Sequence, residues 1–145
     1  MDRATIHAFI GRQRYGVVSS TATNGTPQSA LVGIASTSRL EIIFDTVKNS
    51  RKYPNLIQRP VCSLVIGWSG EQTLQLEGIA EEPQGAALKQ FQDVYFAEWL
   101  ECREHMSWPG IAYFVVRPHW IRYSDYDQKP PLIQEFSKEA LSYDF

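Results

Sequence analysis

The greatest concentration of chemically useful side chains lies in the segment Thr46-Val47-Lys48-Asn49-Ser50-Arg51-Lys52. One hydroxyl stands at the end of an expected strand, and a second hydroxyl with two cations stands where a helix is expected to begin. A helix start presents unpaired backbone N–H groups, to which Ser50 adds a hydroxyl, Arg51 a planar fork of donors and Lys52 a compact charge. This set predicts a site for an anion such as a phosphate monoester. The tripeptide alone leaves open a capped surface helix with two solvated cations.

The context of this segment resembles a known family. Phe44–Lys52 is similar, without a gap, to the Phe-Tyr-Thr…Ser-Arg-Lys segment of the pyridoxamine 5′-phosphate oxidase-like FMN-binding split barrels. The resemblance extends over roughly residues 4 to 125. It implies a mainly β fold, a six-stranded antiparallel split barrel with flanking helices, that works as a homodimer with FMN in a cleft between subunits. It also implies that Thr46, Ser50, Arg51 and Lys52 hold the FMN phosphate.

Several positions depart from the family pattern. Thr73 stands where the oxidases have a Gln that contacts the flavin ring, so its hydroxyl would make a shorter contact, and Asp45 replaces a Tyr at the cofactor. Ala30 and Ala35 replace an Arg and a Lys. The segment after Tyr123-Ser124-Asp125 has no Arg-x-His substrate motif. The resemblance therefore implies FMN binding, but we do not expect efficient oxidation of pyridoxamine 5′-phosphate.

Two functional classes are compatible with the resemblance. One is an FMN-dependent oxidoreductase of unknown substrate, in which the flavin transfers hydride or electrons and the protein positions the ring and the substrate. The other is a non-catalytic flavin- or haem-binding protein that acts as a carrier, a sensor or a stress-related scavenger. The sequence has no Gly-x-Ser-x-Gly elbow, Walker loop or dinucleotide fingerprint, so hydrolase, nucleotidase and Rossmann interpretations have no support.

A metal site is a weaker alternative. Cys102 and His105 are three residues apart and would share one face of a helix. No third or fourth ligand is apparent in the sequence, so we expect packing or capping roles and no metal. Cys62 falls in a different predicted element from Cys102, and we expect both thiols to be reduced. His7 and His119 are isolated.

The elements that position these residues follow from hydrophobic periodicity and turn residues. Helices are expected over residues 2–13, 49–58 and 84–105. Strands are expected over 17–23, 29–36, 40–46, 61–68, 73–80 and 111–123. Asn24-Gly25 predicts a type I′ hairpin turn, and the first three strands are expected to form a meander. Six short strands predict a closed or nearly closed antiparallel barrel, because closure removes exposed strand edges.

Length and composition set the remaining expectations. A chain of 145 residues predicts one domain, residues 1–125, followed by a loosely attached tail, residues 126–145. A net charge of -2 gives no general attraction to nucleic acid. The N-terminal residues lead into no apolar stretch of signal-peptide or membrane-span length, so we expect a cytoplasmic protein. Trp, Tyr and Phe make up 12% of the chain, which favours a homodimer.

Overall fold

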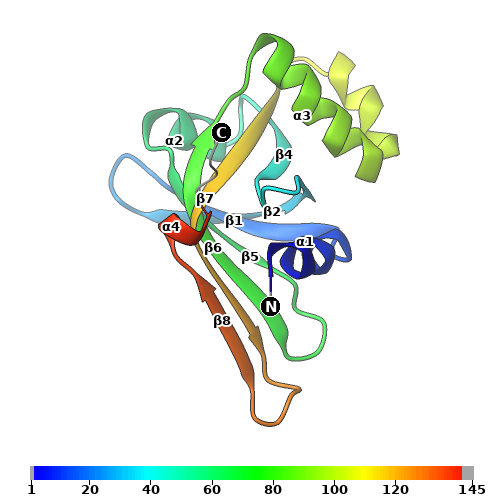
Figure 1. The fold of residues 1–145 in the computed structure, drawn as a ribbon. Helices are drawn as coiled ribbons and strands as arrows, with labels where there is room; N and C mark the ends of the chain where they lie inside the picture. The colour runs from blue at the N-terminus through cyan, green and yellow to red at the C-terminus, as the bar shows by residue number, and fades with distance from the viewer. Residues whose placement is uncertain (1, 142–145) are drawn as a thin grey trace.

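The computed structural model describes residues 2–141 and is organised around a curled antiparallel sheet (Figure 1). Its strands are β1 (Tyr15–Thr21), β2 (Pro27–Gly33), β3 (Ala35–Ser36), β4 (Ile42–Val47), β5 (Val61–Ile66), β6 (Gln72–Glu81), β7 (Ile111–Asp125) and β8 (Leu132–Phe136). The helices are α1 (Arg3–Gly11), α2 (Lys52–Gln58), α3 (Gly85–Glu98), α4 (Lys138–Leu141) and the 3₁₀ helix η1 (Leu100–Ser107). The strand order is β2-β1-β5-β6-β7-β4-β3, with β8 paired to β7. The mainly β split-barrel class predicted from the sequence is confirmed.

The sheet has eight strands among the described residues instead of the predicted six. The predicted strand over residues 29–36 is divided at Ile34, whose N–H donates to the Arg14 carbonyl oxygen at 3.0 Å instead of joining a strand ladder. Both strand pairings of the predicted meander are nevertheless present, and they are made by the two parts of this divided segment. β2 pairs with β1, whereas β3 pairs with β4, which continues the sheet from β7.

The hairpin between β1 and β2 is confirmed, but its turn differs from the type I′ turn that Asn24-Gly25 predicts. Thr21 pairs with Pro27, which leaves a five-residue loop over residues 22–26. The Gly25 N–H donates to the Ala22 carbonyl at 2.8 Å, and Gly25 alone in this loop has a positive φ, of 88°. A longer loop of this kind needs one left-handed residue, whereas a type I′ turn needs two.

The predicted helix over residues 84–105 ends early. α3 stops at Glu98, and Trp99 leaves the helical conformation with φ -123° and ψ 66°. Its indole N–H donates to the Ile34 carbonyl at 2.9 Å, and its ring fills the space where a Cβ on Gly33 would lie, only 2.7 Å away. Docking of this ring on the kinked strand thus breaks the helix. Cys102 consequently lies on η1 and not on the long predicted helix.

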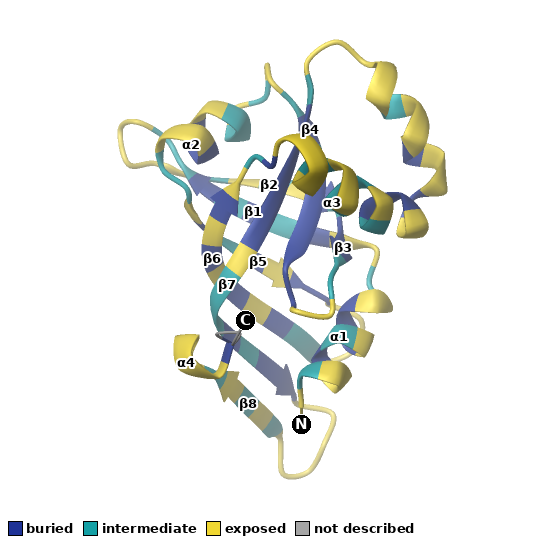
Figure 2. Cartoon of the chain, turned by 45° about the horizontal axis from the view of Figure 1, so that its top comes forward, coloured by how far each residue is buried: buried dark blue, intermediate teal, exposed yellow. Residues whose placement is uncertain are grey.

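The core has two parts that share β4 and β7. Phe44 and Phe114 face a cluster built with α1, while Ile43 and Val115 face a second cluster covered by α3 and η1. Both strands are therefore buried on both faces over this region (Figure 2). Consecutive residues of β4 point into different environments because side chains alternate along a strand.

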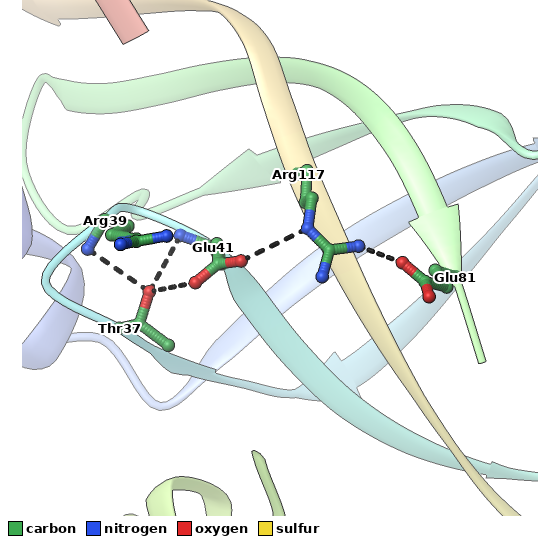
Figure 3. Close-up of polar contacts among 5 residues, drawn as sticks. All are labelled: Thr37, Arg39, Glu41, Glu81 and Arg117. Carbon is green, nitrogen blue, oxygen red and sulfur yellow. Dashed lines mark hydrogen bonds and ion pairs between the residues drawn. The ribbon is translucent and has the colours of Figure 1, made fainter. Parts of the chain in front are cut away.

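A polar network holds the turn that leads into β4 (Figure 3). Thr37 Oγ1 donates to Glu41 Oε1 at 2.9 Å and accepts from the Arg39 backbone N–H at 3.2 Å. The Arg117 guanidinium bridges Glu41, at 3.4 Å, and Glu81. These contacts join the turn to β7 and β6, so they fix where β4 begins.

Both cysteines are free, as predicted, and both are buried. Burial raises the pKa of the Cys62 thiol to about 12, so this thiol is protonated at neutral pH. None of the helices in the described part of the chain has the length and apolar character needed to span a membrane.

The loosely attached tail predicted from the sequence is wrong for residues 132–141. β8 pairs with the second half of β7, from Ile121↔Phe136 to Asp125↔Leu132, and this hairpin extends away from α2 and α3 (Figure 1). Leu141 of α4 is 2% exposed and belongs to the first core cluster. Residues 142–145 of the predicted tail lie outside the described residues.

We expect Leu141→Ala to lower the free energy of unfolding by about 2 kcal/mol, because truncation leaves a cavity in the core. Leu100→Ala is the matched control, since Leu100 is 65% exposed and should cost little. Urea denaturation of the two variants measures the difference. Equal stability of the two variants would show that α4 does not contribute to the core.

Candidate functional site

Thr46 and Ser50 meet at the end of β4, as their spacing predicts for two residues of one anion site. Their hydroxyl oxygens are 3.0 Å apart and hydrogen bonded. Thr46 is buried at 8% exposure, and Ser50 is partly exposed in the turn before α2. The backbone reverses through residues 48–50, where the Ser50 N–H donates to the Val47 carbonyl at 3.0 Å. The pair therefore presents hydroxyl groups at the edge of the core.

Arg51 and Lys52 line one small cavity of about 100 Å³ together with residues of β1 and β2. The other lining residues are Ser20, Gln28, Ser29 and Ala30. Neither cation has a carboxylate within ion-pair distance among residues 2–141. Partial burial lowers the pKa of Lys52, and the negative charge of Asp45 opposes this shift. The cavity thus combines two cations without ion-pair partners and the two hydroxyls of Ser20 and Ser29, which is the donor set of an anion site. Thr46 and Ser50 are not among its lining residues.

α2 is held in place by Asn55, a residue to which sequence analysis assigns no function. Its buried side-chain amide donates to Ser20 Oγ at 3.1 Å and to Gln28 Oε1 at 2.9 Å. Nearby, Arg59 Nε donates to the Thr21 carbonyl at 2.8 Å. These bonds connect α2 to β1 and β2, so they set the position of Arg51 over the cavity.

A groove of about 540 Å³ adjoins this cavity and runs across the outer face of β1, β5, β6 and β7. Thr73 lies in the groove, as do Gln75 and Trp120, and Ser20 lines both the groove and the smaller cavity. Along β5, exposed or partly exposed residues alternate with buried core residues, and both kinds line the groove. A volume of this size is typical of small-molecule sites.

The other residues that the resemblance places near the cofactor lie in three environments. Ala30 lines the cavity together with Arg51. The small alanine, in place of the basic residue of the oxidases, leaves space beside the predicted phosphate site. Ala35 lies apart from it, in a cavity beneath α1 and α3. Asp45 points to the opposite face of β4 from Thr46, where its Oδ2 is 3.0 Å from His105 Nδ1. A direct contact of Asp45 with a cofactor stays a prediction.

Fold and cavities together define an antiparallel split barrel in which a small cavity lined by two cations lies next to a surface groove. The family model for pyridoxamine 5′-phosphate oxidase matches residues 3–125, and the chain belongs to this family. No curated protein sequence matches the chain.

Solved structures share the fold at low sequence identity. The heme binding protein from Mycobacterium smegmatis has 18% identity and a TM-score of 0.82, and the match covers 97% of this chain and 60% of that protein. A pyridoxamine 5′-phosphate oxidase-related, FMN binding protein from Nostoc punctiforme has 12% identity and a TM-score of 0.67, with 92% and 93% covered. The heme storage protein HutZ from Vibrio cholerae has 13% identity and a TM-score of 0.70, with 79% and 88% covered. This chain thus spans less than two thirds of the Mycobacterium smegmatis protein.

Replacing Asn55 with Ala should destabilise the protein by about 1–3 kcal/mol, because Ser20 and Gln28 lose their partner in a buried position. Asn49→Ala removes the same amide from an exposed turn and should have a small effect. Urea unfolding followed by circular dichroism compares the two variants. A similar loss in both would mean that the buried amide does not anchor α2.

Proposed function

We propose that the protein is a flavoprotein that binds FMN, with its phosphate held by Thr46, Ser50, Arg51 and Lys52. The observation that carries this proposal is the cavity that Arg51 and Lys52 line without a carboxylate partner among residues 2–141. Family membership supports it, as does the FMN-binding relative from Nostoc punctiforme. A phosphate monoester carries nearly two negative charges, which these two cations would balance.

Each residue would make a distinct contact. The Arg51 guanidinium can form two parallel hydrogen bonds to phosphate oxygens, whereas the Lys52 ammonium acts as a point charge. Burial makes a charged Lys52 costly on its own, so an anion beside it would compensate for the lost solvation. Because the hydroxyls of Thr46 and Ser50 bond to each other, one of them keeps its proton available for an external acceptor.

We further propose that the protein acts as an FMN-dependent oxidoreductase. Bound FMN supplies hydride or electron transfer. The contribution of the chain would be positional, since Thr73, Gln75 and Trp120 line the groove beside the phosphate cavity. The two unpaired thiols fit a reducing compartment, which supports a cytoplasmic location.

Anaerobic addition of reduced nicotinamide to the FMN-loaded protein tests the proposed activity. Bleaching of the flavin absorbance, faster than that of free FMN, is the expected result. A yellow protein that does not bleach with any reduced nicotinamide would favour a non-catalytic flavin carrier or sensor.

Haem binding is the second candidate, because two structural relatives are named for heme. No histidine lines the groove among the described residues. His7 Nδ1 is instead 3.0 Å from Ser36 Oγ, and His105 pairs with Asp45. The groove therefore offers no imidazole to a haem iron, and we favour FMN.

Arg51→Ala should weaken FMN binding by about ten- to a hundredfold, since a charge-assisted hydrogen bond contributes roughly 1.5–3 kcal/mol. Riboflavin lacks the phosphate and should bind both proteins alike. Arg51→Lys should recover part of the loss, because an ammonium cannot form the bidentate fork. Flavin fluorescence titration measures all three.

Arg12→Ala serves as the control for this substitution, because Arg12 lies beside Phe9 at the end of α1, away from α2 (Figure 1). It should leave FMN affinity unchanged. If Arg51→Ala had no effect, or if FMN and riboflavin lost affinity equally, the phosphate would not bind at Arg51.

We propose that the protein is a homodimer that uses the outer face of the sheet. The strand registers place Leu31, Val17 and Val65 side by side on this face, and Leu31 and Val65 are 60% and 42% exposed. Val61 and Ile79 form a second exposed pair across β5 and β6. Exposed apolar side chains grouped on one sheet face are typical of a subunit interface.

Light scattering at micromolar concentration should give twice the chain mass of 16.6 kDa. Val65→Asp should shift the protein towards the single-chain mass, because dimerisation would bury an unpaired carboxylate. Leu100→Asp, at an exposed apolar residue on η1, should remain dimeric. A single-chain mass for the unsubstituted protein would contradict the dimer.

A further inference from the structure

Asp45, Cys102 and His105 form a cluster on the side of β4 opposite the proposed phosphate site. Their ligand atoms, one from each side chain, all lie within 4.8 Å of one another. His105 Nδ1 is 3.0 Å from Asp45 Oδ2. The three residues come from two elements that are far apart in the sequence, β4 and η1.

The local fold explains why the side chains converge. In a 3₁₀ helix, residues three apart are eclipsed, so Cys102 and His105 project from the same side of η1. η1 begins directly after Trp99, where α3 has ended. The His105 ring is further fixed by stacking on Trp108, with ring centroids 3.7 Å apart.

A second observation points to a missing partner at the same place. Tyr113 is 4% exposed, and its hydroxyl, near the Gln92 side chain, makes no hydrogen bond of good geometry among the described residues. Tyr113 is the cross-strand partner of Asp45 in the β4–β7 register, so both side chains lie on the same face of the sheet. Cys102 belongs to the same buried cluster as Tyr113. An unsatisfied buried hydroxyl therefore accompanies the three potential ligands.

We propose that Asp45, Cys102 and His105 bind a divalent transition-metal ion of the zinc class. Thiolate and imidazole ligands disfavour magnesium and calcium, which prefer oxygen ligands alone. Zinc bonds of about 2.0–2.3 Å in tetrahedral geometry separate ligand atoms by about 3.3–3.7 Å. In the cluster, Asp45 Oδ2 and His105 Nδ1 are 3.0 Å apart and all three ligand atoms lie within 4.8 Å of one another, so small side-chain shifts would bring them to zinc-binding distances.

A metal ion can reach the cluster from solvent. The side chains of Asp45 and His105 are 17% and 21% exposed, whereas Cys102 is buried beneath them. Without an ion, the His105 N–H donates to the Asp45 carboxylate, and an ion between them would replace this contact. Three protein ligands leave a fourth position for water or an exogenous group.

Cobalt binding tests the site directly, because a cobalt–thiolate bond gives a charge-transfer absorption that water, carboxylate and imidazole ligands do not. We would add Co²⁺ to the reduced full-length protein without a histidine tag and follow this band, then displace the cobalt with Zn²⁺. A saturable one-to-one band is expected, and zinc should abolish it. Absence of the band at millimolar Co²⁺ would overturn the proposal.

Variants assign the ligands. Cys102→Ser should remove the band, and His105→Gln should weaken cobalt binding by at least about tenfold, as even outer-shell losses do. Cys62→Ala removes the other thiol, which is buried in the first core cluster, and should bind cobalt normally. His7→Gln is the corresponding histidine control. A band lost in Cys62→Ala or retained in Cys102→Ser would refute the assignment.

Thermal unfolding provides a readout that does not depend on colour. Zinc should raise the melting temperature of the unsubstituted protein and of Cys62→Ala, because a ligand that binds only the folded state stabilises it. His105→Gln should show a much smaller shift. An equal zinc-dependent shift in His105→Gln would contradict binding at this cluster.

Discussion

The arrangement of the whole molecule depends on the pairing of one strand, β7, along both of its edges. One edge pairs with the whole of β6, from Gln72↔Asp125 to Glu81↔Val115. The other edge is shared, first by β4 and then by β8. A bulge separates these regions, where Glu77 pairs with Trp120 and Gly78 with Pro118. A Cβ on Gly78 would lie 2.5 Å from the Arg117 carbonyl oxygen, so the close approach of the strands requires glycine there.

Pairing of β4 with the first half of β7 places two kinds of chemistry on opposite faces of one strand. Thr46 shares its face with Phe44 and ends beside Ser50, whereas Asp45 shares its face with Ile43 and meets His105. Because both faces of β4 are covered, a polar side chain on either face needs a partner. The hydroxyl of Ser50 provides that partner on one face, and the imidazole of His105 provides it on the other.

Local patterns in the sequence predict the class of fold, and they single out the segment from Thr46 to Lys52 as a candidate phosphate site. Both predictions are possible because hydrophobic alternation and residue spacing are local properties. The local patterns could not show the interruption at Ile34 or the end of α3, since both involve contacts between distant segments. The Ile34 N–H bonds to the Arg14 carbonyl, and the Trp99 ring docks on Gly33. The anchoring role of Asn55 was equally hidden, because its partners come from β1 and β2. The spacing of Cys102 and His105 marks them as possible metal ligands in the sequence. Asp45 is brought next to them only by the pairing of β4 with β7, which the sequence does not show.

Asp45 also connects the two proposed sites electrostatically. Its negative charge favours the charged form of Lys52 and so opposes the effect of burial on that ammonium group. A divalent cation at Asp45 would neutralise this carboxylate and add positive charge behind the phosphate cavity. The positive charge of the metal would attract a bound phosphate directly. Neutralising the Asp45 carboxylate would also remove the negative charge that favours the protonated form of Lys52 when no phosphate is bound. Thermodynamic linkage makes this coupling reciprocal. The factor by which the metal changes FMN affinity is also the factor by which FMN changes metal affinity.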